Sequence, residues 1–351
     1  MGKIELDHTG AGSGVTLSSD GTDLLLDGAA IGGGGGTALE LYAENPSSPT
    51  APSATGTNAV AIGRDATATN SDAFSFGYNA RAQGQFSTAI GASALAGNSQ
   101  GATAIGFTAV SQGTSAVAIG DSYASGADSF AAAIANNTSS YGATGANSVA
   151  IGNQGKATAL GAVSLGRGTQ ATANYSLASG LNTVASASYG VALGYESTTY
   201  ATTSLAFASG SFSGFAGQHQ ARIFVLRTRS TDATPKVLVS DGGLSGSTND
   251  QIILPNNSAY AFHGTIVARQ KAGDGTASAA WKVEGLIRRE GSAGTTVLVN
   301  SATTVLDNTP AWGMALSANT TRGGLAIAVT GAASTNIRWV STIHTTEVTY
   351  A

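Results

Sequence analysis

The residues of this chain that could bind a metal or act as a base are few and widely separated. Its four histidines are His8, His219, His263 and His344, and no HxxxH or HExxH spacing, the usual zinc signature, links any of them. One histidine per chain still gives three ligands on the axis of a trimer. His219, in the stretch GQHQ, is the best candidate for such a site. The sequence otherwise predicts no metal and no cofactor.

Hydrolysis would require a serine with a histidine base, or two carboxylates flanking a glycosidic bond. The nearest approach to a nucleophile elbow is GASALAG (residues 91–97), a broken GxSxG motif inside a repeat rather than at a strand-to-helix turn. The carboxylate pairs Glu284 with Glu290 and Asp65 with Asp72 are more typical of solvated surface. We therefore expect a protein that is not an enzyme.

Recognition of a surface partner is the alternative to catalysis, and surface loops commonly carry it. Loop position and residue type select five candidates for receptor contact: Asn256, Asn257, Arg289, Trp312 and Arg322. All three tryptophans, including Trp281 and Trp339, fall in this last third of the chain. A tryptophan within a strand more commonly belongs to a core than to a ligand platform.

The composition indicates a repetitive β structure. Of 351 residues 48 are glycine and only 10% are charged, against about 7% glycine and about 25% charged residues in average globular chains. The net charge of −4 does not indicate the excess of basic residues that is typical of nucleic-acid-binding proteins. The charge is uneven, because residues 1–56 carry one lysine against seven acidic residues, whereas residues 218–351 carry eleven basic and eight acidic residues.

Export and membrane signals are not expected. The start, MGKIELDHTG, is acidic and polar and lacks the basic and apolar regions of a secretory signal. No run of about 18 apolar residues could form a membrane-spanning helix. The chain contains no cysteine, which rules out disulfides and thiolate metal sites.

The first 56 residues combine a strand signal with a linker. Val15 and Leu17 alternate with polar residues, Asp20 and Gly21 supply a turn, and Leu24 and Leu26 resume the alternation, which predicts a hairpin. The glycines of residues 32–36 and the prolines that follow predict a flexible connector.

From residue 57 to about 215 one phrase recurs, as in TNAVAIG (57–63), TSAVAIG (114–120) and ANSVAIG (146–152). The glycines that end the phrases are mostly 14 residues apart, and the longest gap contains a degenerate copy in which Ile134 and Ala135 take the last two positions. About eleven repeats result. Each glycine is expected to form a tight turn with positive φ: Gly63, Gly77, Gly91, Gly106, Gly120, Gly152, Gly166, Gly180 and Gly194.

Large apolar residues precede each glycine at alternate positions, and small pairs such as Ala66 and Ala68 follow it. This alternation predicts two short strands per repeat, one with large and one with small inward residues. A two-strand repeat cannot bury its apolar face alone, so the repeats must stack at about 4.8 Å into a rod roughly 50 Å long. One chain cannot cover these faces, which predicts that copies of the chain associate through the following seam: Val60, Ile62, Ile90, Ile105, Val117, Ile119, Val149, Ile151, Val163, Leu165, Val191 and Leu193.

NSVAIG with a small pair after the glycine and a fourteen-residue period resembles the head repeat of YadA-like trimeric autotransporter adhesins, over about 155 of the 351 residues. The resemblance implies a left-handed parallel β-roll, three chains with their apolar faces around the threefold axis, and attachment to surfaces. The repeats also resemble those of bacteriophage fibre proteins, and MGKIELDHTG with SPTAPSATG is similar to structural proteins of marine phages, including cyanophages.

Residues 218–351 contain nine alternating β runs separated by turn residues, which predict an antiparallel β-sandwich or jelly roll. The runs are ARIFVLRTR, KVLVS, QIILP, AYAFHGTIVARQ, AAWKVEGLIRR, TTVLVN, MALSA, GLAIAVTG and IRWVSTIHTTEVTY. The expected fold class is therefore all-β, a trimeric β-roll followed by this C-terminal domain.

The resemblances imply a homotrimeric phage fibre or spike, assembled in the host cytoplasm and acting outside the cell as part of the virion. Residues 1–31 would bind other virion proteins, 32–56 would be a linker, 57–217 the shaft, and 218–351 a tip that binds a host-surface glycan or protein. Neither nucleic acid binding nor membrane insertion is expected. A capsid decoration or head fibre, a polysaccharide-degrading tailspike and a cellular adhesin are the alternatives.

Overall fold

The computed structural model describes residues 50–133, 140–241, 250–273, 275–308 and 310–350, together with four strands in the first 30 residues. The chain divides into two compact units, Met1–Ser47 and Ser48–Ala351. Over the described residues the fold is all-β, and its one helical element is the 3-10 turn η1 (Ala293–Thr295). None of the helical structure described is of the length and hydropathy needed to cross a bilayer.

The first unit contains an antiparallel sheet of four strands in sequence order: β1 (Ile4–Leu6), β2 (Val15–Ser19), β3 (Leu24–Leu26) and β4 (Ala29–Ala30). The predicted hairpin is confirmed, because β2 pairs with β3 antiparallel. Its turn at Asp20 and Gly21, and the connector of residues 32–36, lie outside the described residues.

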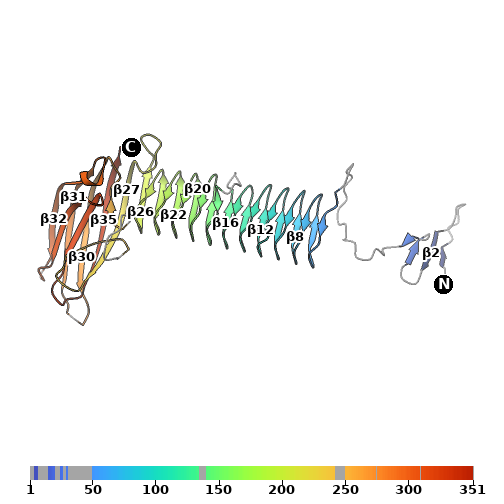
Figure 1. Cartoon of the computed structure of the whole chain (residues 1–351), viewed down its shortest axis with the longest axis horizontal. Coiled ribbons are helices and arrows are strands. Elements are labelled where there is room, and N and C mark those ends of the chain that lie inside the picture. Colours follow the sequence, from blue (N-terminus) through green and yellow to red (C-terminus); the bar gives the residue numbers. More distant parts are fainter. Residues whose placement is uncertain are drawn as a thin grey trace. The chain divides into compact units, whose positions relative to one another are not determined.

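The second unit begins with a parallel β-solenoid of about eleven turns, so the predicted number of repeats is confirmed (Figure 1). Each turn contributes one strand to each of two parallel sheets. We call one of them the long sheet, because it continues into the C-terminal domain. Its solenoid strands are β6 (Val60–Ile62), β8 (Phe74–Phe76), β10 (Thr88–Ile90), β12 (Thr103–Ile105), β14 (Val117–Ile119), β16 (Phe130–Ala132), β18 (Val149–Ile151), β20 (Val163–Arg167), β22 (Leu177–Leu181), β24 (Val191–Tyr195) and β26 (Ser204–Ser209). The other sheet consists of β5 (Ser53–Ala54), β7 (Thr67–Ala68), β9 (Arg81–Ala82), β11 (Leu95–Ala96), β13 (Val110–Ser111), β15 (Tyr123–Ala124), β17 (Gly142–Ala143), β19 (Lys156–Ala157), β21 (Gln170–Ala171), β23 (Val184–Ala185) and β25 (Thr198–Thr199).

The solenoid starts earlier than the sequence indicated. Strand β5 pairs in register with β7, Ser53 opposite Thr67 and Ala54 opposite Ala68. These residues fall within the range assigned to the linker. The prediction missed them because they precede the first complete repeat phrase.

The solenoid interior holds small side chains only, which corrects one expectation. From β8 to β26 the inward residue of the long-sheet strands is an alanine or a serine, such as Ala118 or Ser164, and it is fully buried. The pairs that follow the glycine, such as Ala80 and Ala82, are also fully buried. The large Val, Ile and Leu residues on either side of the central alanine point outward instead, because side chains alternate between the faces of a strand. The prediction that they point into the chain's own interior is wrong.

The predicted turn glycines all have positive φ, from 74° at Gly120 to 129° at Gly77. At Gly77 a Cβ atom would lie 2.7 Å from the Gly91 carbonyl oxygen in the next turn, so only glycine fits there. Non-glycine residues with φ near +55° also recur every seven residues, as at Asn58, Asp65 and Asp72. Each fourteen-residue repeat is therefore two seven-residue half-turns that end in similar left-handed turns.

The degenerate repeat has a different register from the one that the sequence predicts. Strand pairing places Ala132 opposite Ile119 on one side and Ile151 on the other. The turn position is therefore Ala133, with φ 55°, and not Ala135. Ile134 and Ala135 lie outside the described residues.

The nine predicted C-terminal strands and their antiparallel pairing are confirmed. Five of them extend the solenoid's long sheet in the order β32-β31-β30-β35-β27, and four form a second sheet from β28, β29, β33 and β34. Their bounds are β27 (His219–Ser230), β28 (Lys236–Val237), β29 (Ile252–Ile253), β30 (Ser258–Gln270), β31 (Ser278–Arg289), β32 (Val297–Asp307), β33 (Gly313–Asn319), β34 (Gly324–Thr330) and β35 (Ile337–Thr349). The core between the two sheets contains Phe224, Trp281 and Trp339 from the long sheet and Leu325 and Ile327 from the second.

Candidate functional site

The outward face of the long sheet carries large apolar side chains that the chain itself does not bury. Strand pairing aligns the first seam position from turn to turn, for example Thr103, Val117, Phe130 and Val149, and it aligns the second position in the same way. None of the twelve predicted seam residues is buried in the single chain. Soluble monomers rarely expose contiguous apolar patches of this kind, which mark interaction surfaces.

The outward face continues without a break into the C-terminal domain. Strand β26 pairs with β27 so that Leu205 lies opposite Ile223 and Phe207 opposite Ala221. Ile223 in turn lies opposite His344, which lies opposite His263. The two rows of the solenoid seam are therefore extended by residues of β27, β35 and β30. The opposite face of the same strands is buried in the sandwich core.

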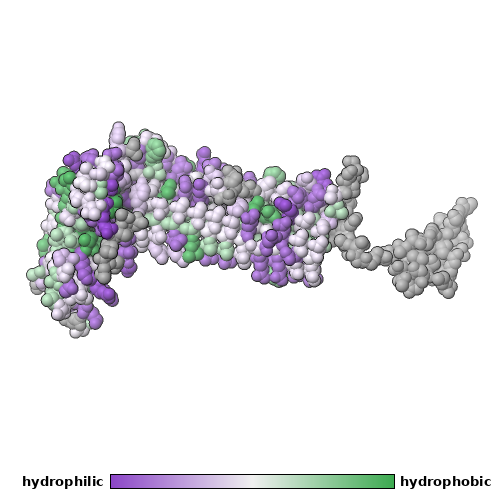
Figure 2. Space-filling model, in the orientation of Figure 1, coloured by the Kyte–Doolittle hydropathy of each residue, from purple (hydrophilic) through white to green (hydrophobic). Residues whose placement is uncertain are grey.

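Further along these strands the outward face remains partly apolar, with Val225, Val267 and Val340 all about half exposed. In Figure 2 hydrophobic patches lie on the C-terminal strands and at intervals along the solenoid. His263 and His344 stack on this face with ring centroids 5.1 Å apart. Among the described residues no group of three or more His, Asp or Glu side chains is placed to hold a metal ion.

A buried ionic network joins the solenoid to the sandwich. Arg222 Nε donates to Glu347 Oε1 at 2.7 Å and Oε2 at 2.8 Å, with both side chains almost fully buried. Arg222 Nη2 donates to Tyr260 Oη at 2.7 Å, and Gln220 Nε2 donates to Glu347 Oε2 at 2.9 Å. The Thr198 backbone N–H, in the last solenoid turn, donates to Gln220 Oε1 at 2.9 Å. The network therefore connects β25 with β27, β30 and β35.

Burial controls the ionisation of this network. Burial raises the pKa of Tyr260 well above its ordinary value, and burial also raises the pKa of Tyr200 beside it. Burial opposes the charge of Arg222, but the attraction of Tyr260 and Glu347 raises the guanidinium pKa overall. The hydrogen bonds of this network tie the last solenoid turn to three strands of the sandwich. Among the described residues, Arg222 Nη1 has no hydrogen-bond partner.

The sequence itself carries a signal for this network. In QARIFVLR, Arg222 occupies the same alternate positions as Phe224 and Leu226, which are both buried. A charged residue in the inward phase of a strand indicates a buried ion pair, because an unpaired charge there would be strongly destabilising.

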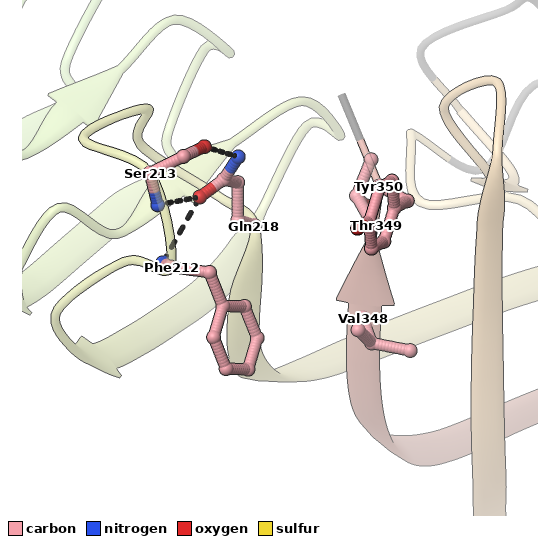
Figure 3. A pocket seen from close by; sticks show the side chains of 6 residues that line it. All are labelled: Phe212, Ser213, Gln218, Val348, Thr349 and Tyr350. Carbon is pink, nitrogen blue, oxygen red and sulfur yellow. Dashed lines mark hydrogen bonds between the residues drawn. The ribbon is translucent and has the colours of Figure 1, made fainter.

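An open pocket of about 440 Å³ lies beside this junction, where the loop after β26 meets the end of β35 (Figure 3). Gln218 Oε1 accepts hydrogen bonds from the backbone N–H groups of Phe212 and Ser213 at 3.0 and 2.9 Å. Val348, Thr349 and Tyr350 line the opposite side. Gln218 is thus committed to holding the loop, and the pocket presents apolar and aromatic surface to solvent.

His219, the candidate for an axial metal, lies at the edge of this pocket. Its ring contacts Phe212, with centroids 4.9 Å apart. It belongs to the outward phase of β27, together with Ala221 and Ile223, and therefore to the same face as the seam. A single chain provides one imidazole here, and an axial metal site remains a prediction.

Comparison with protein families matches the solenoid. The model of the YadA head domain repeat matches residues 54–80, 71–94, 98–122, 143–169, 157–183 and 171–197. The solenoid carries YadA head repeats. The predicted resemblance to that repeat is confirmed, and the unmatched stretch between residues 122 and 143 contains the irregular turn at Ala133.

Among solved structures, three phage tailspikes align with this chain. The first is gp49 of Acinetobacter baumannii bacteriophage Fri1, a capsular polysaccharide depolymerase, with 12% identity over 56% of this chain and 40% of that chain and a TM-score of 0.20. The second is the tailspike of A. baumannii phage AM24, with 10% identity over 85% of this chain and 54% of that chain and a TM-score of 0.18. The third is the tailspike of Acinetobacter phage vB_ApiP_P1, with 12% identity over 86% of this chain and 55% of that chain and a TM-score of 0.17. This chain spans only about half the length of these proteins, and such low TM-scores establish no common fold. No curated protein sequence matches it.

Four of the five predicted contact residues gather at one end of the sandwich, beyond the head repeats. Asn256 and Asn257 are exposed, and Asn257 lines a recess of about 250 Å³ together with Arg289 and Tyr350. Arg289 Nη1 donates to the Leu254 carbonyl at 2.6 Å, so this side chain also holds the loop in place. Arg322 lies in the adjoining turn, where its backbone N–H donates to Asn319 Oδ1 at 3.0 Å.

Trp312 differs from the other candidates. It is 5% exposed, belongs to the sandwich core and packs against Trp339 with ring centroids 5.7 Å apart. It does not present its side chain to a partner, and the expectation for this residue is wrong. Its sequence context, TPAWG, is typical of a loop, but the loop folds back over the core.

Proposed function

We propose that this protein is a homotrimeric fibre or spike of a bacteriophage virion, which spaces a host-binding C-terminal domain away from the particle. The observation that carries the proposal is the row of large apolar residues along the outward face of the head repeats. A solenoid whose interior holds only small side chains such as alanine, serine and threonine does not bury Val117 or Ile119 by itself. Association of three copies through this face would remove it from water, at about 25 cal/mol per Å² buried.

The head repeats are the spacer in this proposal. Eleven turns at about 4.8 Å give a rod of roughly 50 Å, and the backbone ladders make it stiff. The N-terminal segment, residues 1–31, would bind other virion proteins, and the C-terminal sandwich would bind a glycan or protein on the host cell. Three copies of a weak site on one rod raise the overall avidity without any new contact.

The proposed role is binding without chemistry. Three titratable groups with perturbed pKa, Arg222, Tyr260 and Tyr200, interact with one another at the junction. The pKa of the exposed Asp232 is lowered by hydrogen bonds from Thr234 in its own turn. Incubation of the purified protein with host capsular polysaccharide is expected to leave the polymer intact, as judged by its chain length. Cleavage would favour a hydrolytic tailspike instead.

The assembly is tested by light scattering of the purified full chain at micromolar concentration. We expect the mass of a trimer for the natural sequence and a monomer for Ile119→Asp, because a carboxylate in the apolar seam would be desolvated without a partner. The matched control is Gln100→Asp, at an exposed position in a solenoid turn, which should remain a trimer. A monomer for the natural sequence would overturn the proposal.

The position on the particle is tested separately. Cryo-electron microscopy of the intact virion should show trimeric rods at the tail, with the sandwich at the outer end. Rods on the capsid surface would instead assign the chain to the head fibres.

A further inference from the structure

Three arginines form a row across the outward face of the sandwich. Strand pairing places Arg229 of β27 opposite Arg338 of β35, and Arg338 opposite Arg269 of β30. All three are exposed. Ser278 of β31, also exposed, lies opposite Arg269 and completes the row across a fourth strand. We call these three arginines the arginine row.

Like charges placed directly opposite on neighbouring strands destabilise a sheet. Within the described part of the chain, no carboxylate forms an ion pair with any of the three guanidinium groups. Arg269 Nη1 donates to the carbonyl of Thr276, which fixes its position without neutralising it. The row therefore concentrates positive charge at a spacing of about 4.8 Å on a face that the fold leaves open.

The strands beneath the row are rigidly held. Ile337 and Trp339, which flank Arg338 in the sequence, are fully buried in the sandwich core, and Trp339 Nε1 donates to Ser230 Oγ at 2.9 Å. The backbone positions of Arg229 and Arg338 are thereby fixed from behind. A rigid strand gives a more defined site than a mobile loop would.

The row also lies away from the seam. Arg229 is six residues beyond Ile223, the last seam-face residue of β27 that pairs with the solenoid. At about 3.4 Å per residue the distance along the strand is about 20 Å. Association through the seam of the head repeats thus leaves the row open to a ligand.

We propose that the arginine row binds an acidic polysaccharide through its carboxylate or sulfate groups. Guanidinium groups pair with such planar or tetrahedral oxyanions through two parallel hydrogen bonds, which makes arginine more selective here than lysine. A polymer with repeated negative charge engages several arginines at once, and the Ser278 hydroxyl offers a further donor or acceptor. The inference rests on the proposed host-binding function and specifies its ligand.

Nucleic acid fits the row less well. Binding to duplex DNA commonly uses about six to ten phosphate contacts, whereas the row supplies three charges on a chain of net charge −4.

The test measures binding of the full-length protein to polygalacturonate, dextran sulfate and neutral dextran by calorimetry. We expect binding to one or both charged polymers and none to neutral dextran. The triple variant Arg229→Gln, Arg269→Gln, Arg338→Gln should bind at least about tenfold more weakly. The matched control Lys236→Gln, Lys282→Gln, Arg288→Gln removes three cations elsewhere on the same domain and should change the affinity less than about twofold.

The relative response to the two polymers separates a carboxylate ligand from a sulfate ligand. Equal losses in the two triple variants would overturn the inference, because they would show that only total charge matters. Failure of the natural protein to bind either charged polymer, or tighter binding to duplex DNA, would also overturn it.

Adsorption to host cells distinguishes this inference from the proposed function. If the natural protein and the arginine-row variant adsorb equally well, the host-binding function stands and the inference fails. If the natural protein does not adsorb to host cells although it binds a charged polymer in solution, the host-binding function fails. Thermal unfolding of both triple variants verifies that they are folded.

Discussion

The head-repeat solenoid and the C-terminal sandwich share one continuous sheet but use its two faces in opposite ways. In the solenoid the inward face carries alanine and serine, and the large residues Val117 and Ile119 lie outside. In the sandwich the inward face carries Phe224, Trp281 and Trp339, and the second sheet covers it. The sandwich therefore has a core of its own, whereas the solenoid leaves most of its large apolar side chains for a partner.

This difference follows from the width of each layer. The side chains buried between the two solenoid sheets are small, as at Ala80, Ala82, Ala118 and Ser164. The enclosed space accepts methyl groups and little more. The sandwich separates its two sheets by large side chains, at a spacing of about 10 Å.

The largest expected effect tests the junction between the two regions. Glu347→Ala removes the carboxylate that Arg222 contacts at 2.7 Å and leaves a buried guanidinium without its partner. We expect a loss of about 3–5 kcal/mol in unfolding free energy, measured by denaturant unfolding of the full chain. Glu290→Ala, which removes an exposed carboxylate, is the control and should lose less than about 1 kcal/mol. Equal losses would show that the junction is not stabilised by this network.

A pair of substitutions on one solenoid strand tests whether small residues face the interior and large residues face outward. Ala118→Leu forces a large side chain into the closed interior and should destabilise the protein by about 1–3 kcal/mol. Val117→Leu adds volume on the outward face and should change stability by less than about 1 kcal/mol in the same thermal unfolding measurement. If Val117→Leu destabilised the protein more than Ala118→Leu, the assignment of the inward and outward faces would be wrong.

The buried Tyr260 gives the sandwich side of the junction a dependence of stability on pH. Because burial raises the pKa of Tyr260 above its unfolded value of about 10, this tyrosine keeps its proton in the folded state while the unfolded chain loses it. Its contribution is present below about pH 10 and is lost above it, at up to about 1.4 kcal/mol per pH unit.

Unfolding measured between pH 8 and 11 checks this expectation. Tyr260→Phe should decline less steeply than the natural protein, and Tyr350→Phe, at an exposed position, should follow the natural curve. Identical slopes for all three proteins would contradict the role assigned to Tyr260.

The smallest effect tests the irregular turn of the solenoid. Ala133 occupies the turn position with φ 55°, where regular repeats have glycine. Ala133→Gly should stabilise the protein by about 1 kcal/mol, because a left-handed conformation disfavours a Cβ atom. A gain of similar size for Ala132→Gly, the preceding strand residue, would show that the effect is unrelated to φ.

The sequence allowed much of the fold to be predicted. Alternation at period two identified all nine C-terminal strands, and the spacing of the glycines identified about eleven turns. The glycine spacing failed to predict the register at Ala133, because no glycine occupies that turn and an insertion follows it. The seven-residue half-turn was also missed, because Asn58, Asp65 and similar residues adopt left-handed turns without glycine.

The candidate site was predicted less completely. Loop position correctly indicated exposed residues at Asn256 and Asn257, but it failed for Trp312, whose loop folds over the core. The sequence did not predict the arginine row, since Arg229, Arg269 and Arg338 become neighbours only through the pairing of β27, β30 and β35.

By itself the sequence determined the local repeat, its turns and the all-β class, because these depend on residue types at short, fixed spacings. Only the tertiary structure decided which face of each strand is inside. Both faces of a phrase such as AVAIG are apolar, so alternation cannot rank them, and the narrow space between the two solenoid sheets admits only the alanine. The same packing leaves valine and isoleucine on a surface that one chain does not cover.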